Sequence, residues 1–141
     1  MKVSLIQMNS QDDKAANLAQ ARRLIDAAVA EDKPDLVVLP EMFPYLGLDG
    51  DREGRWKAAE DLPNGEAYAL LKELAMRHRI HVHGGSLLEK GTDKLFNTTV
   101  VFAPDGRELA RYRKIHLFDV TTPDGKEYKE SHTFSPCREV V

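Results

Sequence analysis

The stretch that decides the fold is Leu36-Val37-Val38-Leu39-Pro40-Glu41-Met42-Phe43. Its four leading apolar residues suit a short strand that is buried on both faces of a sheet, and Pro40 ends that strand. The next residue is a carboxylate. Because ligands of open α/β sheets gather beyond the carboxyl ends of the strands, we expect Glu41 at the edge of the sheet where a site would lie.

Helical and strand patterns alternate around this stretch. Residues 3–8 form a first strand, and residues 14–31 repeat apolar side chains at helical spacing after an acidic N-cap segment. A second helix is expected to start within residues 63–66. Further strands are expected at three ranges: 80–83, 96–102 and 108–112. The turn tripeptide Pro104-Asp105-Gly106 should join the last two strands as an antiparallel hairpin.

This order of elements predicts the fold class, an α/β layered sheet with helices on one face. Residues 49–54 are expected to be a polar connection, because they show no periodicity. Residues 121–138, dense in Pro, Gly, Ser, Thr and charge, are expected to be a loop. Residues 139–141 look like the start of another strand. No linker or repeat interrupts the chain, so residues 1–141 are expected to form one domain.

Composition excludes several classes of protein. The 141 residues, 42% hydrophobic and 30% charged, are typical of a globular domain with a buried core. A net charge of −3 with scattered basic residues argues against nucleic acid as a partner. No apolar run approaches the roughly 20 residues that span a bilayer, so no membrane contact is expected. A single cysteine and the lack of a signal-peptide pattern favour a cytoplasmic location.

A second informative stretch is Tyr112-Arg113-Lys114-Ile115-His116-Leu117-Phe118-Asp119, which ends a strand-like segment. Lys114 lies among aromatic and aliphatic neighbours, where its charge could stabilise a carbonyl oxygen that becomes negative during acyl transfer. Partial burial of Glu41 would raise its pKa and make it a general base near neutral pH. Taken alone, each residue is weak evidence for a site, because an ordinary solvated charge after a strand gives the same pattern.

Together these motifs resemble the nitrilase superfamily of carbon–nitrogen hydrolases, in the branch of Nit-like proteins and omega-amidases. Leu39 to Phe43 resembles the family's glutamate motif, and Tyr112 to Asp119 resembles its lysine motif. The segment from Tyr128 to Pro136 resembles a loop with a second glutamate, here Glu130. The resemblance implies that Glu41 is the general base, that Lys114 stabilises the tetrahedral intermediate, and that Glu130 positions substrate and lysine.

The family fold is an αββα sandwich, and the resemblance implies that this chain is its N-terminal portion. The family's nucleophilic cysteine would then lie beyond Val141, and the 141 residues alone would be inactive. Cys137 occupies a position where the family usually has glycine, so it is interpreted as a loop thiol and not as the nucleophile. The resemblance implies no cofactor.

His78, His81 and His83 cluster in the sequence near Glu89, which raises the alternative of a metal site. No further ligand has a convincing spacing, so no metal is expected.

The leading hypothesis is therefore an amidase-type carbon–nitrogen hydrolase that acts on a small amide through a thioester, with Glu41 and Lys114 supplied by this chain. The alternative is a catalytically silent, truncated family member that acts as an oligomerising domain. In both cases a homo-oligomer, a dimer or larger, is expected, because an incomplete sandwich exposes apolar sheet surface.

Overall fold

The computed structural model describes residues 1–48 and 50–141. In these residues six strands form one sheet in the order β1-β2-β3-β5-β4, and β6 pairs with the other side of β5. The six strands are β1 (Val3–Leu5), β2 (Leu36–Val38), β3 (His81–His83), β4 (Leu87–Lys90), β5 (Leu95–Phe102) and β6 (Glu108–Arg113). Strands β1, β2 and β3 are parallel, and the remaining pairs are antiparallel. The α/β fold class predicted from the sequence is confirmed.

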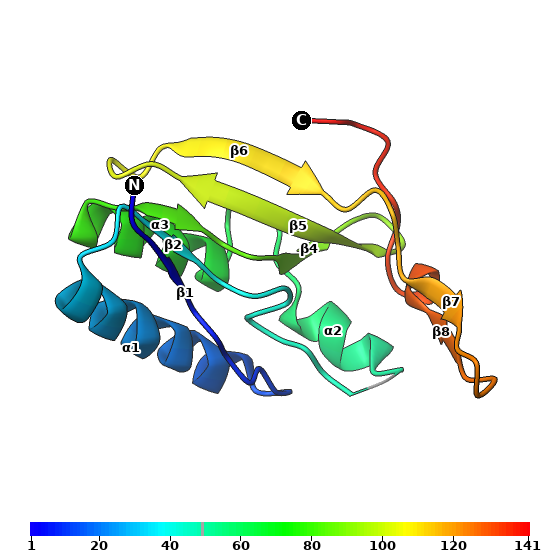
Figure 1. Cartoon of the computed structure of the whole chain (residues 1–141). Coiled ribbons are helices and arrows are strands. Elements are labelled where there is room, and N and C mark those ends of the chain that lie inside the picture. Colours follow the sequence, from blue (N-terminus) through cyan, green and yellow to red (C-terminus); the bar gives the residue numbers. More distant parts are fainter. Residues whose placement is uncertain (49) are drawn as a thin grey trace.

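Two helices cover one face of the sheet (Figure 1). They are α1 (Lys14–Asp32) and α3 (Glu66–His78), and each connects two parallel strands as a crossover. Asp13 caps α1 by accepting a hydrogen bond from the Ala16 amide. The Glu60 carboxylate does the same for α3, because it accepts hydrogen bonds from the amides of Ala67 and Tyr68. Both helices begin where the sequence predicted.

The main core lies between this helical layer and the sheet. Ile25 of α1, Leu71 and Leu74 of α3, and Val82 and Phe102 of the sheet are fully buried in it. On each strand these inward positions alternate with positions that face away from the helices, as a strand requires. Burial of this face fixes the register of the parallel strands.

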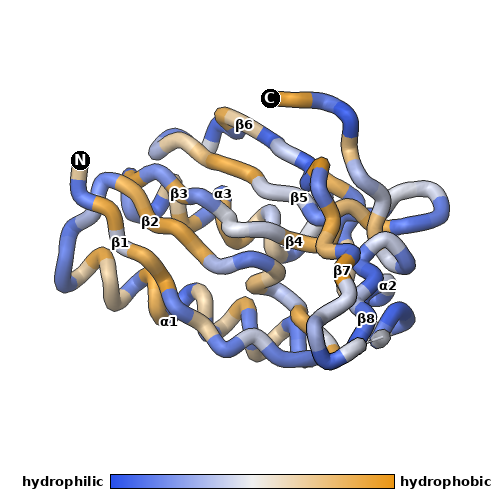
Figure 2. Tube along the Cα trace, turned by 45° about the vertical axis from the view of Figure 1, so that its right-hand side comes forward, coloured by the Kyte–Doolittle hydropathy of each residue, from blue (hydrophilic) through white to orange (hydrophobic). Residues whose placement is uncertain are grey.

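The opposite face of the sheet has no helical layer over it in the described residues (Figure 1). Val3 and Leu5 of β1 face this side and are 41% and 78% exposed. Val38 and His83 continue it across β2 and β3 through the parallel register. Figure 2 shows that β1 and β2 carry apolar residues along their length. The exposed apolar surface expected from the sequence is therefore present on this face.

A second, smaller core lies at the edge of the sheet where β2 ends. In this core the segment that follows β2 packs against three elements, which are β4, the start of β5 and α2 (Arg52–Ala58). Its buried members are Met42, Tyr45, Ala58, Ala59, Leu88, Leu95 and Phe134. This core holds together the segments that carry the predicted site residues.

The prediction of a polar connection at 49–54 is wrong for residues 52–54, which belong to α2; residue 49 lies outside the described residues. A helix this short gives no periodic signal and depends on its cap and its tertiary contacts. Asp51 supplies the cap by accepting from the Gly54 amide, and it also accepts from the Tyr45 hydroxyl.

The prediction of a loop at 121–138 is also wrong in part. Strands β7 (Asp119–Thr121) and β8 (Glu127–Lys129) form an antiparallel hairpin, and a 3-10 helix, η1 (Glu130–His132), follows directly. The turn between the strands contains Pro123-Asp124-Gly125, with Gly125 at a φ of +84°. The same tripeptide chemistry joins β5 to β6, so the signal for the hairpin was present in the sequence.

The strand expected to begin at residue 139 is not formed. Residues 135–141 have no regular secondary structure, and Val140 and Val141 are 87% and 77% exposed. A β-branched segment forms a strand only beside a neighbour that completes its hydrogen bonds, and no described strand pairs with it.

Candidate active site

Glu41 lies in a tight turn after β2 that is clamped to the segment between β3 and β4. The Met42 amide donates to the Ser86 hydroxyl, and the Phe43 amide donates to the Ser86 carbonyl. Gly85 packs directly under the turn at a φ of +55°, and a Cβ there would overlap the carbonyl oxygens of Leu39 and Pro40. The position therefore requires glycine.

The backbone next to Glu41 is strained. Met42 has a φ of +51°, in the left-handed region that residues other than Gly, Asn and Asp rarely adopt. Burial of the Met42 side chain in the second core offsets the cost of this conformation. Such strain persists where surrounding contacts over-determine the backbone, which is common beside functional groups.

Lys114 directly follows β6 and continues its pairing with β5. The Lys114 amide donates to the Asn97 carbonyl at 2.8 Å, and the Cys137 amide donates to the Lys114 carbonyl at 3.1 Å. The preceding residue, Arg113, makes two hydrogen bonds to the buried carboxylate of Glu89. The backbone of Lys114 is thus held from both sides, and only its side chain extends into the site.

Glu130 is the first residue of η1, and the buried side chain of Phe134 anchors the turn that follows it. The Glu130 carbonyl accepts from the amides of Thr133 and Phe134. Its carboxylate accepts from the Phe118 amide at 2.6 Å and therefore also holds the segment after Lys114. With a side chain only 11% exposed, Glu130 is the most buried of the three predicted site residues.

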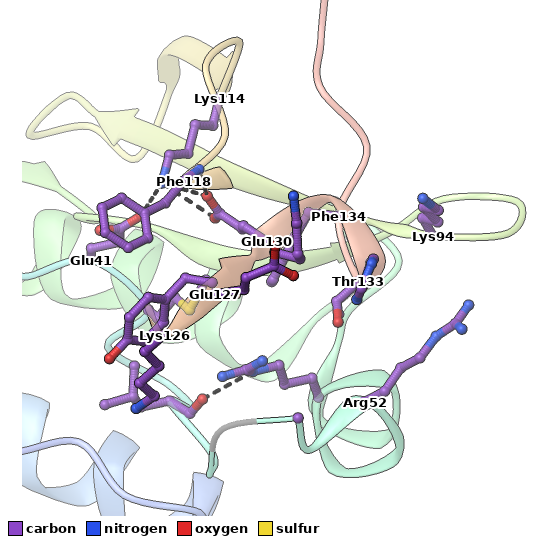
Figure 3. A pocket seen from close by; sticks show the side chains of 17 residues that line it. Glu41, Arg52, Lys94, Lys114, Phe118, Lys126, Glu127, Glu130, Thr133 and Phe134 are labelled. Atoms are coloured by element: carbon purple, nitrogen blue, oxygen red, sulfur yellow. Dashed lines mark hydrogen bonds and ion pairs between the residues drawn. The ribbon is translucent and has the colours of Figure 1, made fainter. Parts of the chain in front are cut away.

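The three side chains meet at Lys114, although they come from distant parts of the sequence (Figure 3). The Lys114 Nζ lies 3.0 Å from Glu41 Oε1 and 3.0 Å from Glu130 Oε2. Glu41 Oε1 also accepts a hydrogen bond of 2.6 Å from the Asn97 side chain. One ammonium group therefore bridges two carboxylates, of which Glu41 is the more exposed, at 59%.

The pKa of Glu41 differs from the sequence expectation. Burial alone would raise the pKa, but the hydrogen bonds from Lys114 and Asn97, together with the charge of Lys114, outweigh it and lower the pKa below its ordinary value. The expected raised pKa is therefore wrong for this state of the protein. Glu41 is ionised at neutral pH, so it holds the form that can accept a proton.

Lys114 is held in its charged form. Burial works to lower the pKa of Lys114, but hydrogen bonds to Glu41 and Glu130 and the two negative charges raise it overall. A lysine with a raised pKa cannot serve as a base at neutral pH. It can supply a fixed positive charge and hydrogen-bond donors to an oxygen that becomes negative, which is the arrangement acyl transfer needs.

The three residues line a cleft of about 1100 Å³. Its described lining includes six lysines and arginines and only three glutamates, so these charged residues give the cleft an excess of positive charge. The whole chain, in contrast, has a net charge of −3. The basic residues are Arg52, Arg55, Lys94, Lys114, Lys126 and Lys129. The surplus of positive charge suits a small anionic ligand.

Cys137 is not among the residues that line this cleft, although its backbone contacts Lys114. Its position agrees with the interpretation as a loop thiol.

Across the described residues, no group of three or more His, Cys, Asp and Glu side chains could hold a metal ion. Within the sequence cluster of histidines and Glu89, His78 pairs with Asp26, and Glu89 pairs with Arg113. Nor is any described helix long and apolar enough to cross a membrane.

Sequence reasoning missed two contributions to the site. The side chain of Asn97 contacts Glu41, although Asn97 is not among the site residues predicted from the sequence. Arg52 and Arg55 reach the cleft from α2, a helix that was not predicted. The available signal for Asn97 was an asparagine inside a strand of β-branched and apolar residues, because a buried amide needs a partner.

Comparison with known proteins adds an independent line of information. A family model described as carbon-nitrogen hydrolase matches residues 2–141. The omega-amidase NIT3 of Saccharomyces cerevisiae is 40% identical over 143 residues, which cover 96% of this chain and 48% of the yeast protein. The human omega-amidase NIT2 is 40% identical over 137 residues, which cover 96% of this chain and 47% of the human protein.

Solved structures agree with these matches. The crystal structure of Saccharomyces cerevisiae Nit3 superposes with a TM-score of 0.82 at 32% identity, over 100% of this chain and 50% of that one. The C. elegans NitFhit protein gives a TM-score of 0.84 at 29% identity, over 99% of this chain and 34% of that one. The chain spans about half the length of the curated relatives it matches.

Proposed function

Because the chain belongs to the carbon–nitrogen hydrolase family, we propose that it supplies the proton-transfer and oxyanion-stabilising groups of an amidase. The observation that carries the proposal is the bridge that Lys114 makes between Glu41 and Glu130, at 3.0 Å on each side. A charged lysine between two carboxylates on the wall of one cleft combines a base, a cation and a group that holds the cation in place.

In this mechanism a cysteine thiol attacks the amide carbon, and Glu41 accepts the thiol proton. The carbonyl oxygen becomes negative and is stabilised by the Lys114 ammonium. Glu41 then returns the proton to the departing nitrogen, ammonia or an amine leaves, and water hydrolyses the remaining thioester. Glu130 holds Lys114 throughout. The cysteine is a feature implied by the family resemblance, and no residue of this chain is assigned to that role.

The proposed substrate is a small amide that carries an anionic group away from the bond that is cleaved. The surplus of lysine and arginine around the cleft supports this choice, because such side chains attract and orient a carboxylate. The names of the relatives, omega-amidases, point to terminal amides. No cofactor enters the proposal, and its expected setting is the cytoplasm.

The experiment is an ammonia-release assay with the product of the complete gene that encodes this chain. We expect hydrolysis of an amide that carries a carboxylate at its other end, and slower hydrolysis of a neutral amide of the same length. The C137S variant should retain the activity. A folded product that releases no ammonia from either amide would overturn the proposal, and loss of activity in C137S would show that Cys137 is the nucleophile.

A non-catalytic, oligomerising domain is the second candidate, and the open sheet face favours it. Val3 and Leu5 expose apolar surface on that face, and such surface promotes association in water. Light scattering on the 141-residue chain over a range of concentrations tests this. A mass above that of the monomer is the expected result, and a monomer at every concentration would remove the basis for a homo-oligomer.

A further inference from the structure

Asn97 contacts both charged partners of the site through two different parts of the residue. Its side-chain nitrogen donates to Glu41 Oε1 at 2.6 Å. Its main-chain carbonyl accepts from the Lys114 amide at 2.8 Å. The residue belongs to β5, in the middle of the sheet, so both contacts originate from a rigid element.

An asparagine at this position destabilises the fold unless its buried amide forms hydrogen bonds. Asn97 is 3% exposed and pairs across the sheet with Leu88 of β4. A buried amide loses its hydrogen bonds to water and must regain them from the protein. The pairing of the backbone strands would be served equally well by an apolar side chain. The contact to Glu41 is the interaction that only a side-chain donor can make.

The contact also distinguishes the two oxygens of Glu41. Asn97 Nδ2 and Lys114 Nζ both donate to Oε1, at 2.6 Å and 3.0 Å. Among the described residues, Oε2 has no hydrogen-bond partner. An incoming proton would therefore be taken up at Oε2, while Oε1 stays fixed by its two donors.

We propose that Asn97 is a positioning residue of this site: its side chain fixes the orientation of the Glu41 carboxylate, and its main-chain carbonyl fixes the start of the Lys114 side chain. The distance between base and cation is thereby set by one residue of the central sheet. This inference rests on the proposed amidase function for its catalytic meaning, but the positioning itself is measurable without turnover.

The test is a pH titration of the Glu41 carboxyl group by carbon-13 NMR in the 141-residue chain. The variant N97A removes the side-chain donor and keeps the main-chain contact to Lys114. The pKa of Glu41 should rise by about half to one unit, because one donor to the charged form is lost. N97D, which preserves the shape of the side chain, should raise it further through repulsion between two carboxylates, and it serves if N97A fails to fold.

The matched control is N17A. Asn17 is also 3% exposed, and its amide donates to the carbonyls of Gln11 and Pro44. None of these three residues lines the cleft. N17A should lower the stability of the protein and leave the pKa of Glu41 unchanged. If the N97A and N97D variants both leave that pKa at its wild-type value, Asn97 is only structural and the inference is wrong.

Turnover separates this inference from the function on which it rests. In the complete gene product, N97A should lower kcat with little change in KM and move the acidic limb of the pH profile upward with the pKa of Glu41. If the amidase activity depends on Glu41 but is unchanged in N97A, the positioning role is refuted and the proposed function is not. A shifted Glu41 pKa in a product without amidase activity would support the positioning and refute the proposed function.

Discussion

Replacing Lys114 by methionine removes the cation between Glu41 and Glu130 and keeps most of the side-chain volume. At 3.0 Å, a unit charge interacts with the Glu41 carboxylate by about 1.4 kcal/mol even at the dielectric constant of water. The 59% exposure of Glu41 keeps the interaction close to that screened limit. Since about 1.4 kcal/mol corresponds to one pKa unit, K114M should raise the pKa of Glu41 by about one unit.

The assay is again a carbon-13 titration of the Glu41 carboxyl group, here in K114M and in a control, K57M. Lys57 forms an ion pair of 2.6 Å with Glu53 on the surface of α2 and is not part of the cleft lining. K57M should therefore leave the pKa of Glu41 unchanged. An unchanged Glu41 pKa in K114M would refute the claim that the observed bridge controls the ionisation of the site.

Three further predictions concern the framework of the site. G85A should lower the free energy of unfolding by about 3 kcal/mol or more, because the added Cβ overlaps the Leu39 and Pro40 carbonyls and the backbone is left-handed. The control is G125A, where φ is +84° and the surrounding space is open. It should lower the free energy of unfolding, measured in denaturant, by only about 1 kcal/mol. E89Q should destabilise the protein by about 2 kcal/mol at pH 7, because it breaks the buried pair with Arg113. Burial acts to raise the pKa of Glu89, but Arg113 and Thr98 lower it overall, so its contribution to stability is complete above the ordinary value of 4.5 and is lost as the pH falls through the lower folded value. Thermal unfolding should show the gap between wild type and E89Q closing below about pH 4.5, and a constant gap down to pH 2 would contradict this. E60A should lower stability by about 1 to 2 kcal/mol, because the amides of Ala67 and Tyr68 at the start of α3 lose their acceptor; equal stability of E60A and wild type in urea would rule out this cap.

Long elements with a strong period were predictable from the sequence. The stripe of apolar residues placed α1 within one residue of its observed end, and the Pro104-Asp105-Gly106 turn placed the β5–β6 hairpin. Short elements that depend on tertiary contacts were not. Strand β4 is buried at Leu87, Leu88 and Glu89 in succession, so it shows no alternation. Helix α2 depends on its Asp51 cap and on contacts with the second core.

In the site, too, the positions of residues after strands were predictable from the sequence, whereas features that depend on tertiary contacts were not. The expectation that Glu41 lies at the carboxyl edge of the sheet came from a short apolar strand followed by Pro40, and Lys114 follows a strand that ends at the same edge. The roles of Glu41 and Lys114 were inferred from their surroundings and from the family resemblance, that of Glu130 from the resemblance alone, and all three stay predictions. The lowered pKa of Glu41 could not be predicted from the sequence, because it depends on the two donors that the fold brings to Oε1.

We propose that Glu41 and Lys114 act as one catalytic unit, and kcat of the complete gene product with E41Q, K114M and the double variant tests this. E41Q alone should reduce kcat for the amide with a distal carboxylate by about a hundredfold or more, since a positioned base contributes at least that much. The double variant should be little worse than the more impaired single variant, because residues that act as a unit are not additive. If E41Q keeps the wild-type kcat, or if the two losses simply multiply in the double variant, the two residues do not act as a unit.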